Sequence, residues 1–127
     1  MKRKNRVLSD YNCVLCSSAT EETLMHLFFH CSFSQACWAF LGIQWNLTLH
    51  PVDMVITARQ NFGRSCFREI MIVACWTIWC HRNSVIFDSA TTSLVRWKTS
   101  FRDEIAKANL RAKASLSVDL NSWLSSL

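Results

Sequence analysis

Glycine and proline are scarce in this sequence, which has only two glycines and one proline in 127 residues. Sheets and hairpins need such turn residues at regular intervals, so their scarcity disfavours an all-β protein. Charged residues are also few, at 18%, whereas half of the chain is hydrophobic and includes six Trp and eight Phe. We therefore expect an all-α protein, a small helical bundle with some apolar surface left for a partner.

Recognisable catalytic patterns are absent as well. No Ser-His-Asp, Cys-His or Gly-rich phosphate-binding pattern stands out, and the nine carboxylates are scattered along the chain. We therefore expect no enzymatic activity and no small-molecule substrate.

Long hydrophobic runs are missing too. The longest, Ile70 to Cys80, is about half of what a bilayer crossing requires, and charged residues bracket it. Seven cysteines, an odd number, without a secretory signal favour free thiols in a reducing compartment. We expect no membrane association and an intracellular location, in the cytoplasm or the nucleus.

Four of the possible metal ligands form a pattern in the first third of the chain. Cys13 and Cys16 are separated by two residues, and His26 and Cys31 follow as a second pair. This spacing is typical of a structural zinc site with three Cys ligands and one His. Four protein ligands leave no position for a catalytic water. The alternative is that these cysteines are small core residues and His26 a hydrogen-bonded core histidine.

The second ligand pair constrains the local backbone. On a regular α-helix, residues five apart are offset by roughly 140°, so His26 and Cys31 cannot face one ion unless the helix ends near His30. Ser32 and Gln35 form a capping-box pattern that starts a new helix there. His30 is the competing ligand, because it lies four residues after His26 and shares its face if the helix continues.

The rest of the chain divides into segments of one predicted domain, residues 1–127. The four segments are a basic arm (1–10), a zinc corner with two short helices (11–42), a helical core (52–114) and a tail (115–127). Within them we predict helices over 19–29, 33–41, 52–62, 65–87 and from Leu94 onward. The helix of 65–87 is apolar on nearly all sides and is expected at the centre of the bundle. One of its faces could stack Arg82 on Trp79, although we favour core packing as the role of Trp76 and Trp79.

The zinc motif also carries a family resemblance. Cys-Val-Leu-Cys, then Glu21-Glu22, then His-Leu-Phe-Phe-His-Cys-Ser-Phe-Ser and Trp38 resemble the zinc-binding domain that follows the reverse transcriptase in plant LINE-like, non-LTR retroelements. The likeness extends through the Trp-Thr-Ile-Trp stretch to Ile86-Phe87. It implies Zn²⁺ on Cys13, Cys16, His26 and Cys31.

Two departures from that family affect the expected function. The sequence begins inside the domain, as if at an internal methionine, and it lacks the paired-aspartate signature of the polymerase. We therefore expect a truncated, free-standing fragment without reverse transcriptase activity.

Positive charge makes nucleic-acid binding one functional hypothesis. The formal net charge is +5, and the positive side chains are concentrated in a basic arm and on the outer face of the last long helix. The candidate residues are Lys2, Arg3, Lys4, Arg6, Arg96, Lys98, Arg102, Lys107 and Arg111. Such binding is expected to be backbone-directed and steeply salt-dependent. The simpler interpretation is a solvated terminus and a solvated helix face.

Protein interaction is the hypothesis that we prefer. High apolar content favours a partner protein or a second copy of the chain. So does the truncated N-terminus, which should leave core surface of the family's domain uncovered. We place the predicted partner interface on Trp97, Phe101, Ile105 and Trp123. The tail either docks as a short helix or remains exposed as a binding segment.

Overall fold

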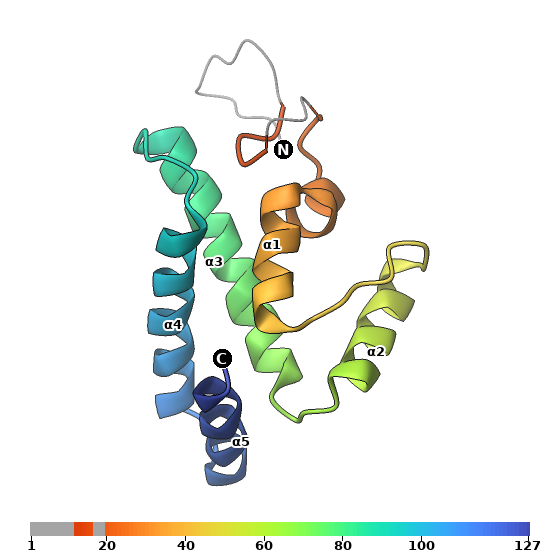
Figure 1. Ribbon diagram of the computed structural model, residues 1–127, viewed down its shortest axis with the longest axis vertical. Helices are drawn as coiled ribbons and strands as arrows, with labels where there is room; N and C mark the ends of the chain where they lie inside the picture. Colours follow the sequence, from red (N-terminus) through yellow and green to blue (C-terminus); the bar gives the residue numbers. More distant parts are fainter. Residues whose placement is uncertain (1–11, 17–19) are drawn as a thin grey trace.

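Helices account for all the regular structure in the described part of the chain. The computed structural model describes residues 12–16 and 20–127, and within these ranges it has no β-strand. A short π-helical turn, η1, precedes five α-helices (Figure 1). The bounds are η1 His26–His30, α1 Ser32–Leu41, α2 Pro51–Phe62, α3 Phe67–Phe87, α4 Leu94–Leu110 and α5 Ala114–Ser125. The predicted all-α fold is confirmed.

Helix α3 lies at the centre of the bundle. It packs most extensively along α4, and it also contacts α1 and α2 (Figure 1). Helix α5 packs on α4 at the end of the bundle away from η1. The predicted guanidinium stacking is present, because the Arg82 guanidinium carbon lies 4.6 Å from the centre of the Trp79 ring.

The helix ends follow local rules of the sequence. Gly42 and Gly63 have φ values of 76° and 71° and terminate α1 and α2, a conformation that costs glycine little. The first helix is shorter in the structure than the one predicted over 19–29. Its proposed start near Ala19 lies outside the described residues, and helix begins only after Thr23, whose hydroxyl accepts a hydrogen bond from the His26 N–H at 3.0 Å.

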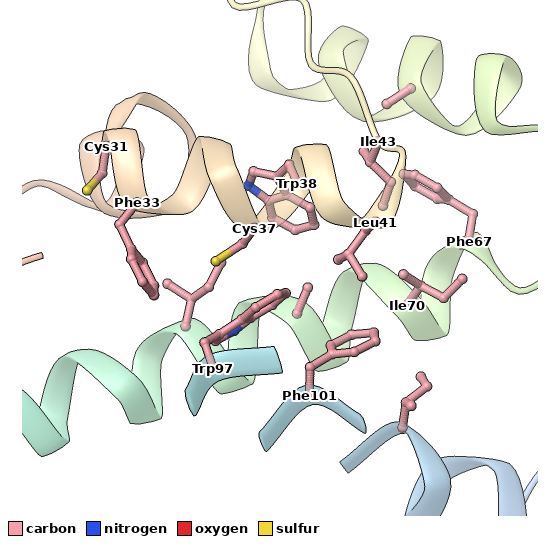
Figure 2. Packing of buried hydrophobic residues seen from close by; sticks show 14 of the residues in the cluster. Cys31, Phe33, Cys37, Trp38, Leu41, Ile43, Phe67, Ile70, Trp97 and Phe101 are labelled. Atoms are coloured by element: carbon pink, nitrogen blue, oxygen red, sulfur yellow. The ribbon is translucent and has the colours of Figure 1, made fainter. Parts of the chain in front are cut away.

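One continuous hydrophobic core extends from Cys13 to Trp123. Figure 2 shows Trp38 and Leu41 of α1 and Trp97 and Phe101 of α4 in the same packed layer. The predicted partner interface is therefore wrong. Its four residues are buried in the core and cannot contact a partner: the exposed fractions are 0% for Trp97, 0% for Phe101, 1% for Ile105 and 5% for Trp123. The amphipathic stripe of α4 covers α1 and α3 instead of facing a partner, and the tail docks as α5.

Two helices leave large apolar side chains exposed, including α3, which we expected at the centre of the bundle. In α2, Met54 and Ala58 are buried, whereas Val52 and Ile56 are about half exposed or more. Either pair fits a helical stripe, so spacing alone could not select the buried face. In α3, Ile72 and Trp76 are likewise half exposed.

Helix α3 also meets the length and hydropathy criteria for a membrane-spanning helix, with 21 residues and a mean hydropathy of 1.3. A buried core helix passes the same test, and α3 occupies the bundle centre here.

Candidate metal centre

The first half of the site is formed by two chain segments that lie antiparallel, as in a hairpin. Asn12 and Glu21 form an isolated antiparallel bridge, and the Cys13 N–H donates to the Thr20 carbonyl at 2.9 Å. These bonds bring the turn that carries Cys13 and Cys16 beside the segment that leads to His26.

A π-helical turn builds the second half. The Cys31 N–H donates to the His26 carbonyl five residues earlier, at 2.7 Å. The wider turn reduces the angular offset that an α-helix would leave between these two residues. Cys31 itself is extended, with ψ of 133°, and stands at the corner before α1. The predicted corner position of Cys31 is confirmed, although its cause is a π turn and not only an early helix end.

The four predicted ligands lie together. One ligand atom from each of Cys13, Cys16, His26 and Cys31 lies within 4.8 Å of all the others. The Sγ atoms of Cys13 and Cys31 are 3.8 Å apart, and Cys16 Sγ is 3.4 Å from His26 Nε2. A tetrahedron with Zn–S of about 2.3 Å and Zn–N of about 2.0–2.1 Å has S···S and S···N edges of roughly 3.8 and 3.6 Å. The donor set therefore fits a zinc ion in both chemistry and size.

The competing ligand is not in this cluster. His30 is exposed to solvent, whereas His26 is 8% exposed.

The capping box expected at the start of α1 is wrong. Cys31, not Ser32, is the N-cap residue, and the Gln35 amide donates to the Phe29 carbonyl at 3.4 Å. Ser34 binds the Leu27 carbonyl instead, which ties η1 to α1.

The Cys13 thiol and the start of α1 together favour a thiolate at Cys31. Its pKa is lowered to about 5, chiefly because the Cys13 thiol donates a hydrogen bond to it, and the backbone N–H groups of Ser34 and Phe33 act in the same direction. The same contact raises the pKa of Cys13, as does its burial. Two sulfurs held this close cannot both ionise cheaply unless a cation lies between them. All seven cysteines are free thiols, so the 3.8 Å contact is not a disulfide.

A buried ion pair attaches the site to the bundle. The Arg82 Nε donates to a Glu22 carboxylate oxygen at 2.8 Å, and its Nη2 binds the other oxygen. Both side chains are almost fully buried. We expected Glu22 in the first turn of a helix. It lies before that turn, and no local pattern indicated a partner sixty positions away.

The basic residues predicted to bind nucleic acid have varied surroundings. Arg96 is used inside the fold, because it donates to the Thr91 carbonyl at 2.6 Å and to the Ser84 hydroxyl at 3.1 Å. Lys98 and Arg102 lie over the Phe40 ring. Lys107 lies 3.5 Å from a Glu104 carboxylate oxygen, and Arg111 is exposed at the end of α4. The predicted basic arm, with Lys2, Arg3, Lys4 and Arg6, lies outside the described residues.

Comparison with known families agrees with this geometry. A family model described as zinc-binding in reverse transcriptase matches residues 1–38, the segment that contains all four clustered ligands. The resemblance to the zinc-binding segment of reverse transcriptases is confirmed for these residues. The origin in a plant retroelement and the extension to the later Trp-rich region stay predictions. Searches of curated proteins and of solved structures found no match.

Proposed function

We propose that this chain, whose residues 1–38 match the zinc-binding segment of reverse transcriptases, is a non-catalytic, retroelement-derived zinc module that acts through protein interaction. Cys13, Cys16, His26 and Cys31 would hold the ion, and all four positions of a tetrahedral zinc would then be filled by protein. Zinc so bound stabilises a fold and does not activate water.

The observation that carries the interaction role is the apolar surface of α2 and α3. Val52, Ile56, Ile72 and Trp76 are between 48% and 60% exposed, although the chain has a well-filled core beneath them. Each pair is spaced by four residues, so each stands on one face of its helix. Apolar side chains that remain exposed in this way favour a protein partner or a second copy.

Nucleic-acid binding remains the second candidate, supported by exposed Arg102, Lys107 and Arg111 on α4 and its end. A salt titration against single-stranded and duplex DNA, run beside light scattering, separates the two. Protein interaction predicts a stable oligomer, or partner binding, without salt-sensitive DNA binding. A monomer whose DNA affinity falls steeply with salt would favour nucleic acid instead.

The metal assignment is tested by the zinc content of purified, undenatured protein. We expect one zinc per chain, which Cys13→Ser abolishes. The matched control is Cys80→Ser, because Cys80 is exposed on α3 and is not part of the cluster. Zinc that survives Cys13→Ser, or that both variants lose alike, contradicts the assignment.

A further inference from the structure

A groove lies at the end of the bundle where α2 ends, α3 begins and α4 turns into α5. It has a volume of about 650 Å³ and contains residues from all four helices or their ends. None of its lining residues belongs to the zinc cluster. We call it the basic groove, after the four exposed cations in its lining, which we call its rim: Arg59, Arg68, Arg111 and Lys113.

The charge of the basic groove is largely uncompensated. Within the described part of the chain, Arg59, Arg111 and Lys113 form no ion pair, and Arg68 has only a long contact of 3.8 Å with Glu69. Glu69 is the one carboxylate among the lining residues, against four cations. Like charges held around one opening raise the local potential and attract an anionic partner.

The lining of the same groove also includes apolar side chains, which we call its floor. Met71, Ile72 and Leu116 line it, and the Ile72 side chain is 49% exposed. Phe67 also contributes, but with 2% exposure its ring offers no face on which a base could stack. Single-stranded nucleic acid binds through such stacking platforms, so this floor suits aliphatic side chains better than bases.

We propose that the basic groove binds an amphipathic helix of a partner protein, with aliphatic residues on one face and Asp or Glu along its edges. An aliphatic and Met floor beneath a cationic rim is complementary to that pattern, because the apolar face enters the groove while the carboxylates meet the rim. This inference rests on the proposed function and specifies the partner's chemistry.

The test uses the full chain loaded with zinc and a fluorescent synthetic peptide. The peptide carries Leu at helical spacings of three and four with Glu on both flanks, and a second peptide has Lys in place of each Glu. We expect the Glu peptide to bind and the Lys peptide not to bind, measured by fluorescence anisotropy. Arg59→Glu with Arg111→Glu should weaken binding roughly tenfold or more.

The control is a double variant with the same change in charge at two positions outside the groove. Arg102→Glu with Lys107→Glu reverses two cations on α4 that do not line the groove and should leave peptide affinity unchanged. Ile72→Gln, which makes the exposed part of the apolar floor polar without changing charge, should weaken binding as well. Equal losses in both double variants, or binding of a single-stranded oligonucleotide in place of the peptide, would overturn the proposal.

Self-association separates failure of the groove from failure of the proposed function. If the wild-type chain forms oligomers in light scattering but does not bind the peptide, the interaction function stands and the groove assignment falls. A monomer that does not bind the peptide and binds DNA with an affinity that falls steeply with salt contradicts both.

Discussion

His26 and His30 differ by four positions and by their surroundings. His26 faces Cys16 at 3.4 Å within the cluster, whereas His30 is exposed to solvent. We expect His26→Asn to abolish stoichiometric zinc binding and His30→Asn to leave it intact, as measured by elemental analysis. Loss of zinc in both variants would make His30, and not Cys31, the fourth ligand beside His26.

Glu22 and Arg82 permit a sharper energetic test. Because both are buried, Glu22→Leu leaves the guanidinium without its carboxylate and should lower unfolding free energy by about 3–5 kcal/mol. Glu22→Leu combined with Arg82→Met removes both charges and should cost less than Glu22→Leu alone. Urea denaturation of Glu22→Leu, Arg82→Met and the double variant measures this, and additive losses would show that the pair is not coupled.

His81 is a buried group with a perturbed pKa. It is 3% exposed, stacks on Phe33 with ring centres 4.8 Å apart, and accepts a hydrogen bond from the Ser93 N–H at 3.1 Å. Burial, together with the nearby Arg96 guanidinium, lowers its pKa to about 4. The unfolded chain therefore binds a proton more readily below about pH 6.5, so stability is full above that pH and falls toward pH 4.

His81→Gln keeps an acceptor near the Ser93 N–H but does not titrate. We expect the loss of stability between pH 6.5 and pH 4, roughly 2–3 kcal/mol from this group, to be smaller in the variant. Loss of zinc on acidification affects both proteins and cancels in the comparison. Identical pH profiles in chemical denaturation would contradict this role for His81.

At the scale of helices, α4 connects the whole bundle. Trp97 fills the space between α1 and α3, and its indole N–H donates to the Thr77 hydroxyl at 3.0 Å (Figure 2). Its neighbours Phe40 and Phe101 contact the ring edge and face. The stripe on α4 was predictable from spacing, but its use as core required knowledge of which helices lie beside it.

Trp97→Ala should lower unfolding free energy by about 3–5 kcal/mol, because it leaves a large cavity and removes the partner of a buried hydroxyl. Trp76→Ala is the matched control, since Trp76 is 55% exposed on α3. We expect the control to change stability by less than about 1 kcal/mol in thermal and urea unfolding. A similar loss in both variants would contradict the burial pattern.

At the scale of the whole molecule, the zinc cluster and the bundle share one core. Cys13, Leu15 and Cys31 belong to the same hydrophobic cluster as Leu120 and Trp123 near the other end of the chain. Disturbance at the metal should therefore spread through the fold instead of remaining local.

Chelation of zinc should consequently lower the midpoint of thermal unfolding for the entire chain. We expect circular dichroism of the helices and Trp fluorescence to shift together, because both report on one cooperative unit. Added zinc should restore the original midpoint, whereas magnesium should not. Helical signal that is insensitive to the chelator would show that the bundle folds independently of the metal.

The sequence alone determined the all-α class, the ends of α1 and α2 at Gly42 and Gly63, and the four candidate ligands that cluster, Cys13, Cys16, His26 and Cys31. Such features depend on nearby residues, through turn conformation, helical period and ligand spacing. Tertiary structure decided which apolar faces are buried, which side chain pairs with Glu22, and where cations from four helices meet as the basic groove. Those outcomes depend on residues far apart in the chain, whose proximity no local pattern encodes.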